Sequence, residues 1–357
     1  MRVVLWTDAT GVGGAEISVA NLVGAAPAGL DLVVAGVHRG TVERLAGGRA
    51  EPVVLGAGPA ATAAGLRRLG PDVVHVNRYV PWSSATAVAA ALALPAARVV
   101  TVDQLPLRTT AAHELWRTRA LTLRADAAVA VGRVSARRIE DFYALGRGSV
   151  RSVPNGVPPV DVPVRPADAD LVVGSLGRLD PMKGFDVALH ALADVPGVRL
   201  VVHGSGGAGS DLAALAGRLG VADRVRWAPW TDDREEALGG LDAFVLPSRT
   251  EGFSLSLVEA MSAGLPCIAS SVGGAEEALD GGRAGLLVRP DDAAGLAGAL
   301  TALRDDRGLR DRLGAAARER ARSLYTAQAM ARAYADLWAE VVDRPRAPRL
   351  RPPRPRA

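Results

Sequence analysis

Two cations lie close together where a predicted strand gives way to a predicted helix. The segment Gly177-Arg-Leu-Asp-Pro-Met-Lys-Gly184 follows a Val-rich run, and its Lys183 is the one lysine among 42 basic residues. A forked guanidinium at Arg178 and a compact ammonium at Lys183 suit the two phosphates of a pyrophosphate without a metal ion. Ligands of open α/β folds bind at the carboxyl ends of strands, where both side chains are expected. The alternative is a pair of solvated surface charges.

Two carboxylates with seven residues between them follow another predicted strand. Glu251 stands in the loop after the strand, Gly252 permits an open backbone, and a helix is expected to begin near Leu255. The free amides of that helix start could hold sugar hydroxyls or phosphate oxygens. Glu259, on the helix body, could accept both hydroxyls of a ribose. The alternative is a capping box in Ser256-Leu-Val-Glu259, which would make Glu259 a residue of the helix start.

The first half of the chain offers a glycine-rich turn and one carboxylate. The turn, Gly11-Val-Gly-Gly-Ala-Glu16, follows the first strand and opens a helix, so its backbone could approach an anionic group. Its spacing is not the G-x-G-x-x-G of dinucleotide-binding folds, and a plain tight turn is the alternative. Asp103, at the end of the strand near Val99–Val102, could orient a sugar or accept a proton. A loop carboxylate without a role is the competing interpretation.

Short Val-rich runs alternate with Ala/Leu/Arg segments of helical period, which predicts parallel sheets covered by helices on both faces. The first half should contain strands near residues 3–6, 32–35, 73–76, 99–102 and 127–130, with helices near 15–24, 60–69, 111–124 and 133–145. The second half should contain strands near residues 171–175, 199–203, 225–227, 243–246, 267–270 and 286–288. Two such series predict two doubly wound, Rossmann-like domains.

The domain boundary is expected in the Pro-rich stretch around residues 157–169, because proline excludes regular structure there. We therefore predict a first domain over residues 1–160 and a second over residues 161–325. A C-terminal helix at residues 326–343 is expected to cross back to the first domain. Residues 344–357, rich in Pro and Arg, are expected to form a disordered basic tail.

Charge and composition restrict the partners. The formal net charge is +4, but the tail carries six Arg and no acid, which leaves 36 basic against 38 acidic residues in the body. A nearly neutral body argues against nucleic acid as a partner. The single Cys267 excludes an internal disulfide and a cysteine-based metal cluster, and the scattered histidines give little support to a zinc site, so no metal is expected.

Nothing in the sequence predicts a membrane span or a secretory signal. The apolar run at residues 85–94 is too short to cross a bilayer, and the start of the chain lacks the pattern of a signal peptide. The expected location is the cytoplasm. The helix at residues 111–124 carries Trp116 beside several arginines, so it could rest on an anionic membrane surface; a solvated basic face is the other interpretation.

These segments, in this order, resemble glycosyltransferase family 4, whose members have the GT-B fold. The resemblance spans residues 1–340 and is most specific in G-R-L-D-P-M-K-G, in L-P-S-R-T-E-G-F-S-L-S-L-V-E-A-M-S-A-G-L-P, and in S-V-G-G-A-E-E. It implies two Rossmann-like domains facing across a cleft, with an acceptor side first and a donor-binding domain second. It also implies a retaining, metal-independent transfer of a sugar from a nucleotide diphosphate donor, which is expected to be UDP- or GDP-linked, and no other cofactor.

The resemblance also implies a role for individual residues. Arg178 and Lys183 would neutralise the leaving diphosphate, and Glu259 would bind the ribose. Glu251 would hold the transferred sugar, together with the backbone of Gly252, Phe253, Ser254 and Leu255. Further contacts to the donor are implied for Gly13 and Gly14 from the first domain, and for His203, Gly204 and Trp230 around the base.

One departure and two rival functions stay open. Family members usually have a histidine where this sequence has Asp103, and that histidine is thought to contact the donor sugar, so we predict that Asp103 influences donor choice. A GT-B nucleotide-sugar epimerase would use the same donor lobe without a separate acceptor. A non-catalytic partner subunit would keep the fold and bind a nucleotide. The acceptor itself, whether natural product, saccharide or lipid, is not identified by the sequence.

Overall fold

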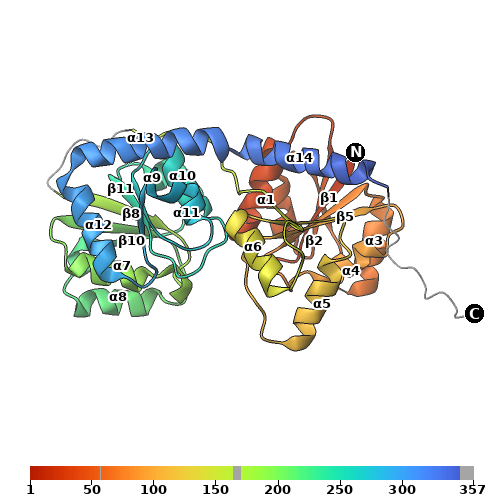
Figure 1. Ribbon diagram of the computed structural model, residues 1–357, viewed down its shortest axis with the longest axis horizontal. Coiled ribbons are helices and arrows are strands. Elements are labelled where there is room, and N and C mark those ends of the chain that lie inside the picture. Colours follow the sequence, from red (N-terminus) through yellow and green to blue (C-terminus); the bar gives the residue numbers. More distant parts are fainter. Residues whose placement is uncertain (57, 164–169, 346–357) are drawn as a thin grey trace, which may run out of the picture. The chain divides into compact units, whose positions relative to one another are not determined.

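The protein, described here by a computed structural model covering residues 1–56, 58–163 and 170–345, divides into two compact units (Figure 1). Among the described residues, those up to Pro154 and from Ala327 to Pro345 form the first unit, and those from Asn155 to Thr326 form the second. Each unit contains one parallel sheet with helices packed on it, so the predicted fold class is confirmed. The units divide after Pro154, six residues before the predicted boundary at residue 160.

The first unit has a seven-stranded parallel sheet in the order β3-β2-β1-β4-β5-β6-β7. Its five inner strands are buried along nearly their whole length, as expected for strands covered on both faces, whereas the edge strand at residues 51–54 is mostly exposed. The strands are β1 (Arg2–Thr7), β2 (Asp31–Gly36), β3 (Glu51–Val54), β4 (Val73–Arg78), β5 (Arg98–Asp103), β6 (Ala127–Ala130) and β7 (Val150–Ser152). The helices are α1 (Gly14–Ala25), α2 (Arg39–Ala46), α3 (Pro59–Leu69), α4 (Ala85–Leu92), α5 (Ala112–Thr122), α6 (Arg133–Phe142) and α14 (Ala327–Asp343).

Helix α14 is the last element of the chain that the structure describes, yet it belongs to the first unit. It packs beside α1, and Figure 1 shows it in blue along this unit. The buried ring of His75, on β4, meets Tyr334 and Trp338 of α14 edge-on, at ring-centroid distances of 5.0 and 5.7 Å. The predicted return of the C-terminal helix to the first domain is therefore confirmed.

The second unit has a six-stranded parallel sheet in the order β10-β9-β8-β11-β12-β13. Its strands are β8 (Leu171–Leu176), β9 (Val198–His203), β10 (Val225–Ala228), β11 (Ala243–Leu246), β12 (Cys267–Ser270) and β13 (Leu286–Val288). Its helices are α7 (Phe185–Ala193), α8 (Gly209–Arg218), α9 (Arg234–Leu238), α10 (Leu255–Ala263), α11 (Ala275–Ala278), α12 (Ala293–Asp305) and α13 (Arg307–Leu324). A separate apolar core lies between this sheet and helices such as α7 and α12.

Two remaining sequence expectations concern the surface. Trp116 on α5 is 64% exposed. This exposure fits both a membrane contact and a solvated basic face, so both stay predictions. No helix within the described ranges is long and apolar enough to span a bilayer. Of the predicted basic tail, residues 346–357 lie outside the described residues.

Candidate active site

The sheet of the second unit reverses its winding between β8 and β11. The chain continues from β8 to its neighbour β9 on one side, whereas β11 pairs with β8 on the other. Such a reversal leaves a crevice at the carboxyl ends of the two strands, where open α/β sheets bind ligands. The loop after β8 carries Arg178 and Lys183, and the loop after β11 carries Glu251. The structure therefore brings the two sequence motifs to one place.

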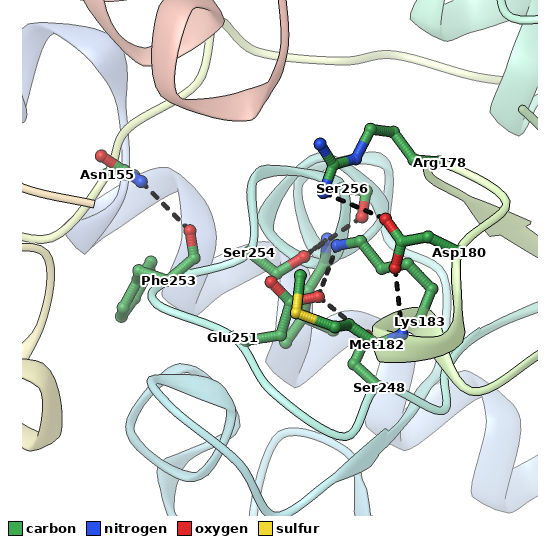
Figure 2. Close-up of polar contacts among 11 residues, drawn as sticks. Asn155, Arg178, Asp180, Met182, Lys183, Ser248, Glu251, Phe253, Ser254 and Ser256 are labelled. Carbon is green, nitrogen blue, oxygen red and sulfur yellow. Dashed lines mark hydrogen bonds and ion pairs between the residues drawn. The ribbon is translucent and has the colours of Figure 1, made fainter. Parts of the chain in front are cut away.

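Lys183 and Glu251 are in direct contact. The Lys183 ammonium lies 2.6 Å from Oε1 of Glu251, and the Ser248 hydroxyl donates to the same oxygen at 2.8 Å (Figure 2). Both charged side chains are mostly buried, at 20% and 11% exposure. Because ion pairs are screened less away from water, each side chain fixes the other. For Lys183, this buried ion pair argues against the alternative of a solvated surface charge.

Arg178 is the more open of the two cations. Its side chain is 58% exposed, and Nη2 lies 3.0 Å from Oδ2 of Asp180 (Figure 2). The other carboxylate oxygen of Asp180 accepts a hydrogen bond from the Met182 amide at 3.0 Å, which caps the short 3-10 turn Pro181–Lys183. Asp180 therefore orients both the turn that presents Lys183 and the guanidinium of Arg178.

Glycines let the loops of the site approach each other closely. Gly184, after Lys183, has a φ of 65°, and a Cβ there would lie 2.1 Å from the carbonyl oxygen of Pro247 at the end of β11. Gly273 has a φ of 54°, and a Cβ on it would lie 2.3 Å from the carbonyl oxygen of Glu251. Only glycine fits both conditions. These two contacts hold the Lys183 and Glu251 loops in place.

Helix α10 begins directly after the Glu251 loop. Ser254 is its N-cap, with Oγ accepting from the Leu257 amide at 3.4 Å. The side chains of Phe253 and Leu255 are buried, and the Phe253 carbonyl accepts from the Asn155 amide at 3.1 Å (Figure 2). A donor contact at these two positions would therefore use backbone, as the family resemblance implies. Amides in the first turn of a helix have no partner four residues back, so they suit anionic oxygens.

Glu259 is a buried carboxylate on α10 with a cation that the sequence analysis did not predict. Its Oε1 lies 2.9 Å from Nε of Arg234, and both side chains are largely buried. Burial raises the pKa of Glu259 above its ordinary value, and the charge and hydrogen bond of Arg234 offset only part of this rise. Since Ser254 is the N-cap, Glu259 is the fifth residue of the helix. The alternative of a capping box headed by Ser256 is therefore wrong.

Three other residues assigned to the base pocket lie at neighbouring strand ends. His203 ends β9 and pairs in register with Ala228 of β10, and Trp230 follows β10 with 40% of its surface exposed. Burial is the main cause that lowers the pKa of His203. A Cβ on Gly204 would lie 1.9 Å from the carbonyl oxygen of Gly177, so this glycine packs the loop after β9 against the loop after β8. The structure thus groups these residues at one edge of the second unit.

Gly13 and Gly14 lie at the start of α1 in the first unit. The Gly13 amide donates to the Glu16 carboxylate at 3.1 Å, so Glu16 caps the helix. A Cβ on Gly14 would meet no atom within 4 Å, and one on Gly13 would make an ordinary 3.5 Å contact with Glu16. Neither glycine is required by the packing of its own unit, and a donor contact at both stays a prediction.

Asp103 does not face an open surface, so the prediction that it points to a ligand is wrong for this structure. Its side chain is 0% exposed and lies 2.8 Å from Nη2 of Arg78, the residue beside it on β4. Burial raises the pKa of Asp103, and Arg78 lowers it. The carboxylate therefore balances a buried guanidinium inside the first unit. Arg78 also lies 3.5 Å from the Thr122 hydroxyl of α5.

Three residues that organise the site were missed from the sequence. Arg234 lies in the charged run Asp232-Asp-Arg-Glu-Glu236, which is typical of an exposed loop. Ser248 and Gly273 fall within the segments quoted for the family resemblance, so that resemblance was the available signal for them. No periodicity marks Arg234, because its partner Glu259 is distant in sequence.

The fold has clear relatives among solved structures. The Anabaena protein Alr3699/HepE in complex with UDP gives a TM-score of 0.85 at 20% identity, covering 95% of this chain and 100% of that one. A sucrose-phosphate synthase from Thermosynechococcus elongatus gives 0.81 at 21% identity, covering 95% and 98%. Together with the two sheets and the switch-point site, these similarities define the fold as that of the GT-B glycosyltransferases.

The sequence comparisons name the family. The model described as Glycosyltransferase Family 4 matches residues 12–160, and that described as Glycosyl transferases group 1 matches residues 162–320. This chain belongs to glycosyltransferase family 4.

The lipopolysaccharide core biosynthesis glycosyltransferase LpsE of Rhizobium meliloti is 36% identical over 174 residues, 49% of this chain and 51% of that protein. A D-inositol 3-phosphate glycosyltransferase of Nocardia farcinica is 32% identical over 60% of this chain and 53% of that protein. The chain spans about half the length of these curated relatives.

Proposed function

We propose that this protein is a retaining glycosyltransferase that moves a sugar from a UDP- or GDP-linked donor to an acceptor hydroxyl, without a metal ion. The observation that carries the proposal is the contact between Lys183 and Glu251 at the switch point, with Arg178 on the same loop as Lys183. We further propose that it acts in the cytoplasm. The acceptor stays unassigned among saccharide, lipid and natural product.

The proposed mechanism is electrostatic. As the bond between sugar and diphosphate breaks, negative charge grows on the leaving diphosphate and positive charge on the sugar ring. Lys183 and Arg178 supply cations for the first charge, and Glu251 supplies a carboxylate for the second. Groups that are already oriented need no rearrangement during the reaction, which is the source of the rate gain. The buried contacts of Ser248 and Lys183 with Glu251 support such prior orientation.

The donor proposal is supported by a fold relative. The Anabaena protein Alr3699/HepE has been solved with UDP and with UDP-glucose. In our protein, the phosphates would meet Arg178, Lys183 and the start of α10, and the ribose would meet Glu259. Gly13 and Gly14 would contact the donor from the first unit, and Asp103 has no part in the proposal because it is buried.

Thermal shift with nucleotides tests the donor part of this proposal. We expect UDP or GDP, and the matching nucleotide sugar, to raise the melting temperature, because a ligand of the native state stabilises it. Lys183→Ala should weaken the affinity about 10- to 150-fold, the loss of one charge-assisted hydrogen bond. Lys183→Arg should recover it in part. Arg218→Ala, on an exposed arginine of α8, is the matched control and should bind like the wild type.

Product analysis tests the reaction itself. NMR of the product should show the anomeric configuration of the donor, and a chelator should leave the rate unchanged. If no nucleoside diphosphate binds, or if Lys183→Ala binds as tightly as the wild type, the proposed donor site is wrong. An epimerised sugar formed from donor alone would point to the epimerase instead. Binding without turnover over a broad acceptor panel would point to a non-catalytic subunit.

A further inference from the structure

Arg234 makes three contacts that no role proposed so far requires. It is the first residue of α9, and its Nε lies 2.9 Å from Oε1 of the buried Glu259. Its Nη1 donates to the carbonyl oxygen of Thr231 at 2.6 Å. Its guanidinium carbon lies 4.8 Å from the centre of the Trp230 ring, within the range of a cation–π interaction. Only 15% of the side chain is exposed.

The loop that carries Arg234 is held by its own hydrogen bonds. Asp233 caps α9 by accepting from the Glu236 amide at 2.9 Å, and the Thr231 hydroxyl donates to the Glu236 carboxylate at 3.2 Å. The Trp230 ring nitrogen donates to Asp232 at 3.3 Å. Arg234 is therefore presented from an ordered turn, and its guanidinium lies between an indole ring and a carboxylate.

We propose that Arg234 positions the nucleoside half of the donor site by holding Glu259 as an oriented carboxylate and by supporting the Trp230 ring against a nucleobase. This inference rests on the proposed function, in which Glu259 binds the ribose. Arg234 is a positioning residue, because it acts through Glu259 and Trp230. A charged carboxylate can accept from both ribose hydroxyls, whereas a protonated one keeps a hydrogen on one oxygen and accepts less well.

The surroundings of Glu259 make Arg234 the group that controls its charge. Helix α10 packs on α9, α13, β11 and β12. From α13, Arg318 and Arg322 donate to the carbonyl oxygens of Ala263 and Ser262 at the far end of α10. From β12 comes the buried thiol of Cys267, and β11 brings apolar side chains. Among these neighbours, Arg234 is the one whose charge and hydrogen bond lower the pKa of Glu259.

The test is the pH dependence of nucleotide affinity, measured by calorimetric titration with UDP, and with GDP in parallel, between pH 6 and 9. We expect the wild-type affinity to change less over this range than the affinity of Arg234→Gln, because Arg234 lowers the pKa of Glu259. In Arg234→Gln, burial leaves Glu259 protonated at the acid end, so the affinity should be about tenfold weaker near pH 6 and should recover as the pH rises. Arg234→Lys should restore most of the affinity at pH 6, because it keeps the positive charge.

Further variants separate the two contacts of Arg234. Arg234→Gln combined with Glu259→Gln should bind weakly at every pH, because no carboxylate is left to titrate. Trp230→Leu should weaken binding without a pH dependence. Pyrophosphate should bind Arg234→Gln as it binds the wild type, since Arg234 acts on the nucleoside half. Arg218→Gln, on the exposed face of α8, is the matched control, and melting temperatures check that each variant is folded.

Three outcomes would overturn the inference. If Arg234→Gln binds UDP and GDP like the wild type at every pH, Arg234 positions nothing. If Arg234→Gln loses affinity for nucleotide and for pyrophosphate equally, Arg234 supports the structure of the whole site and not the nucleoside half in particular. If the wild type binds neither nucleotide, the proposed function fails together with this inference; in the first two cases the proposed function survives. Should Arg234→Gln not fold, the Trp230→Leu variant decides: weaker binding of UDP and GDP with unchanged pyrophosphate affinity supports the inference, and unchanged nucleotide affinity overturns it.

Discussion

Lys183 and Glu251 neutralise each other in the structure, and a donor would change that balance. A diphosphate between Lys183 and Arg178 would compete with Glu251 for the ammonium, and the carboxylate would gain freedom to face the sugar ring. The Ser248 hydroxyl, 2.8 Å from the same carboxylate oxygen, would keep Glu251 in place. The residue that holds the cation before binding is therefore also the residue nearest the sugar in the proposed mechanism.

The two glutamates should differ in kinetics. Glu251→Gln should lower kcat more than it raises KM, because the carboxylate gains most where positive charge builds on the sugar. Glu259→Gln should act mainly on KM for the donor, because ribose is bound alike in the ground and transition states. A lost charge-assisted hydrogen bond corresponds to about 10- to 150-fold in either parameter. Steady-state kinetics with melting temperatures measures both; a Glu259→Gln enzyme with unchanged donor KM would contradict the ribose role.

The buried pair of Arg78 and Asp103 carries a prediction about stability. Asp103→Asn leaves the guanidinium without its charge partner and should cost about 3–5 kcal/mol of unfolding free energy. Replacing both residues, as Arg78→Met with Asp103→Leu, should recover most of this loss, because an apolar pair removes the buried charges together. Urea unfolding of the single and double variants measures the difference. An Asp103→Asn protein of normal stability but altered donor choice would restore the original interpretation of this residue.

At the scale of elements, the start of α1 is a helix end whose glycines are not needed for packing. Because neither Gly13 nor Gly14 carries a side chain, the backbone there is open to a close approach by a ligand. The elements of the second unit differ, because Gly184 and Gly273 are required by contacts with neighbouring loops. Glycines in the two units therefore serve different purposes.

Gly14→Ala tests this distinction. We expect it to leave the melting temperature within about 2 °C or raise it slightly, since alanine favours a helix by up to about 1 kcal/mol over glycine. Donor turnover should fall at least about tenfold, as expected for a methyl group placed where a ligand approaches. Gly24→Ala, near the other end of the same helix and also in open space, is the matched control and should turn over like the wild type. Equal activity in both variants would exclude the first helix from the donor site.

Most elements could be predicted from the sequence, because buried parallel strands appear as Val-rich runs and helices as apolar periodicity. Strand β3, with Glu51 and Pro52, lacks such a run and was missed, as were the three-residue strand β7 and the short helices α2 and α4. Asp103 was predicted to face a ligand because its partner could not be seen in the sequence. The register between β4 and β5 places Asp103 beside Arg78, and no local sequence pattern encodes that register. Arg234 was missed for the same reason: its importance comes from a distant carboxylate.

At the scale of the whole molecule, His75 joins the first sheet to the last helix. Its ring is buried against Tyr334 and Trp338, and burial lowers its pKa to about 3. In the unfolded chain this ring takes up a proton near pH 6.5. Because the folded pKa is the lower one, the unfolded state binds more protons between these values. The stabilising contribution is therefore complete above about pH 6.5 and is lost as the pH falls toward 3.

His75→Gln should remove this part of the acid sensitivity. For the wild type, the contribution of His75 falls by about 1.4 kcal/mol per pH unit below pH 6.5. The variant should be less stable at pH 7.5, because it loses the ring contacts with α14, but its stability should decline less steeply down to pH 5. Urea unfolding at several pH values measures both slopes. His113→Gln, at an exposed histidine on α5, is the control and should keep the wild-type dependence of stability on pH. If His75→Gln also keeps it, His75 does not cause the loss of stability in acid.

The membership of α14 in the first unit also has a consequence for biosynthesis. A ribosome delivers residues in order, so the second unit leaves the exit tunnel complete while the first still lacks α14. Until residues 327–343 emerge, the sheet face around His75 is uncovered, and a nascent chain with exposed apolar surface is prone to misassembly. The half of the protein that is made first is therefore the half that finishes folding last.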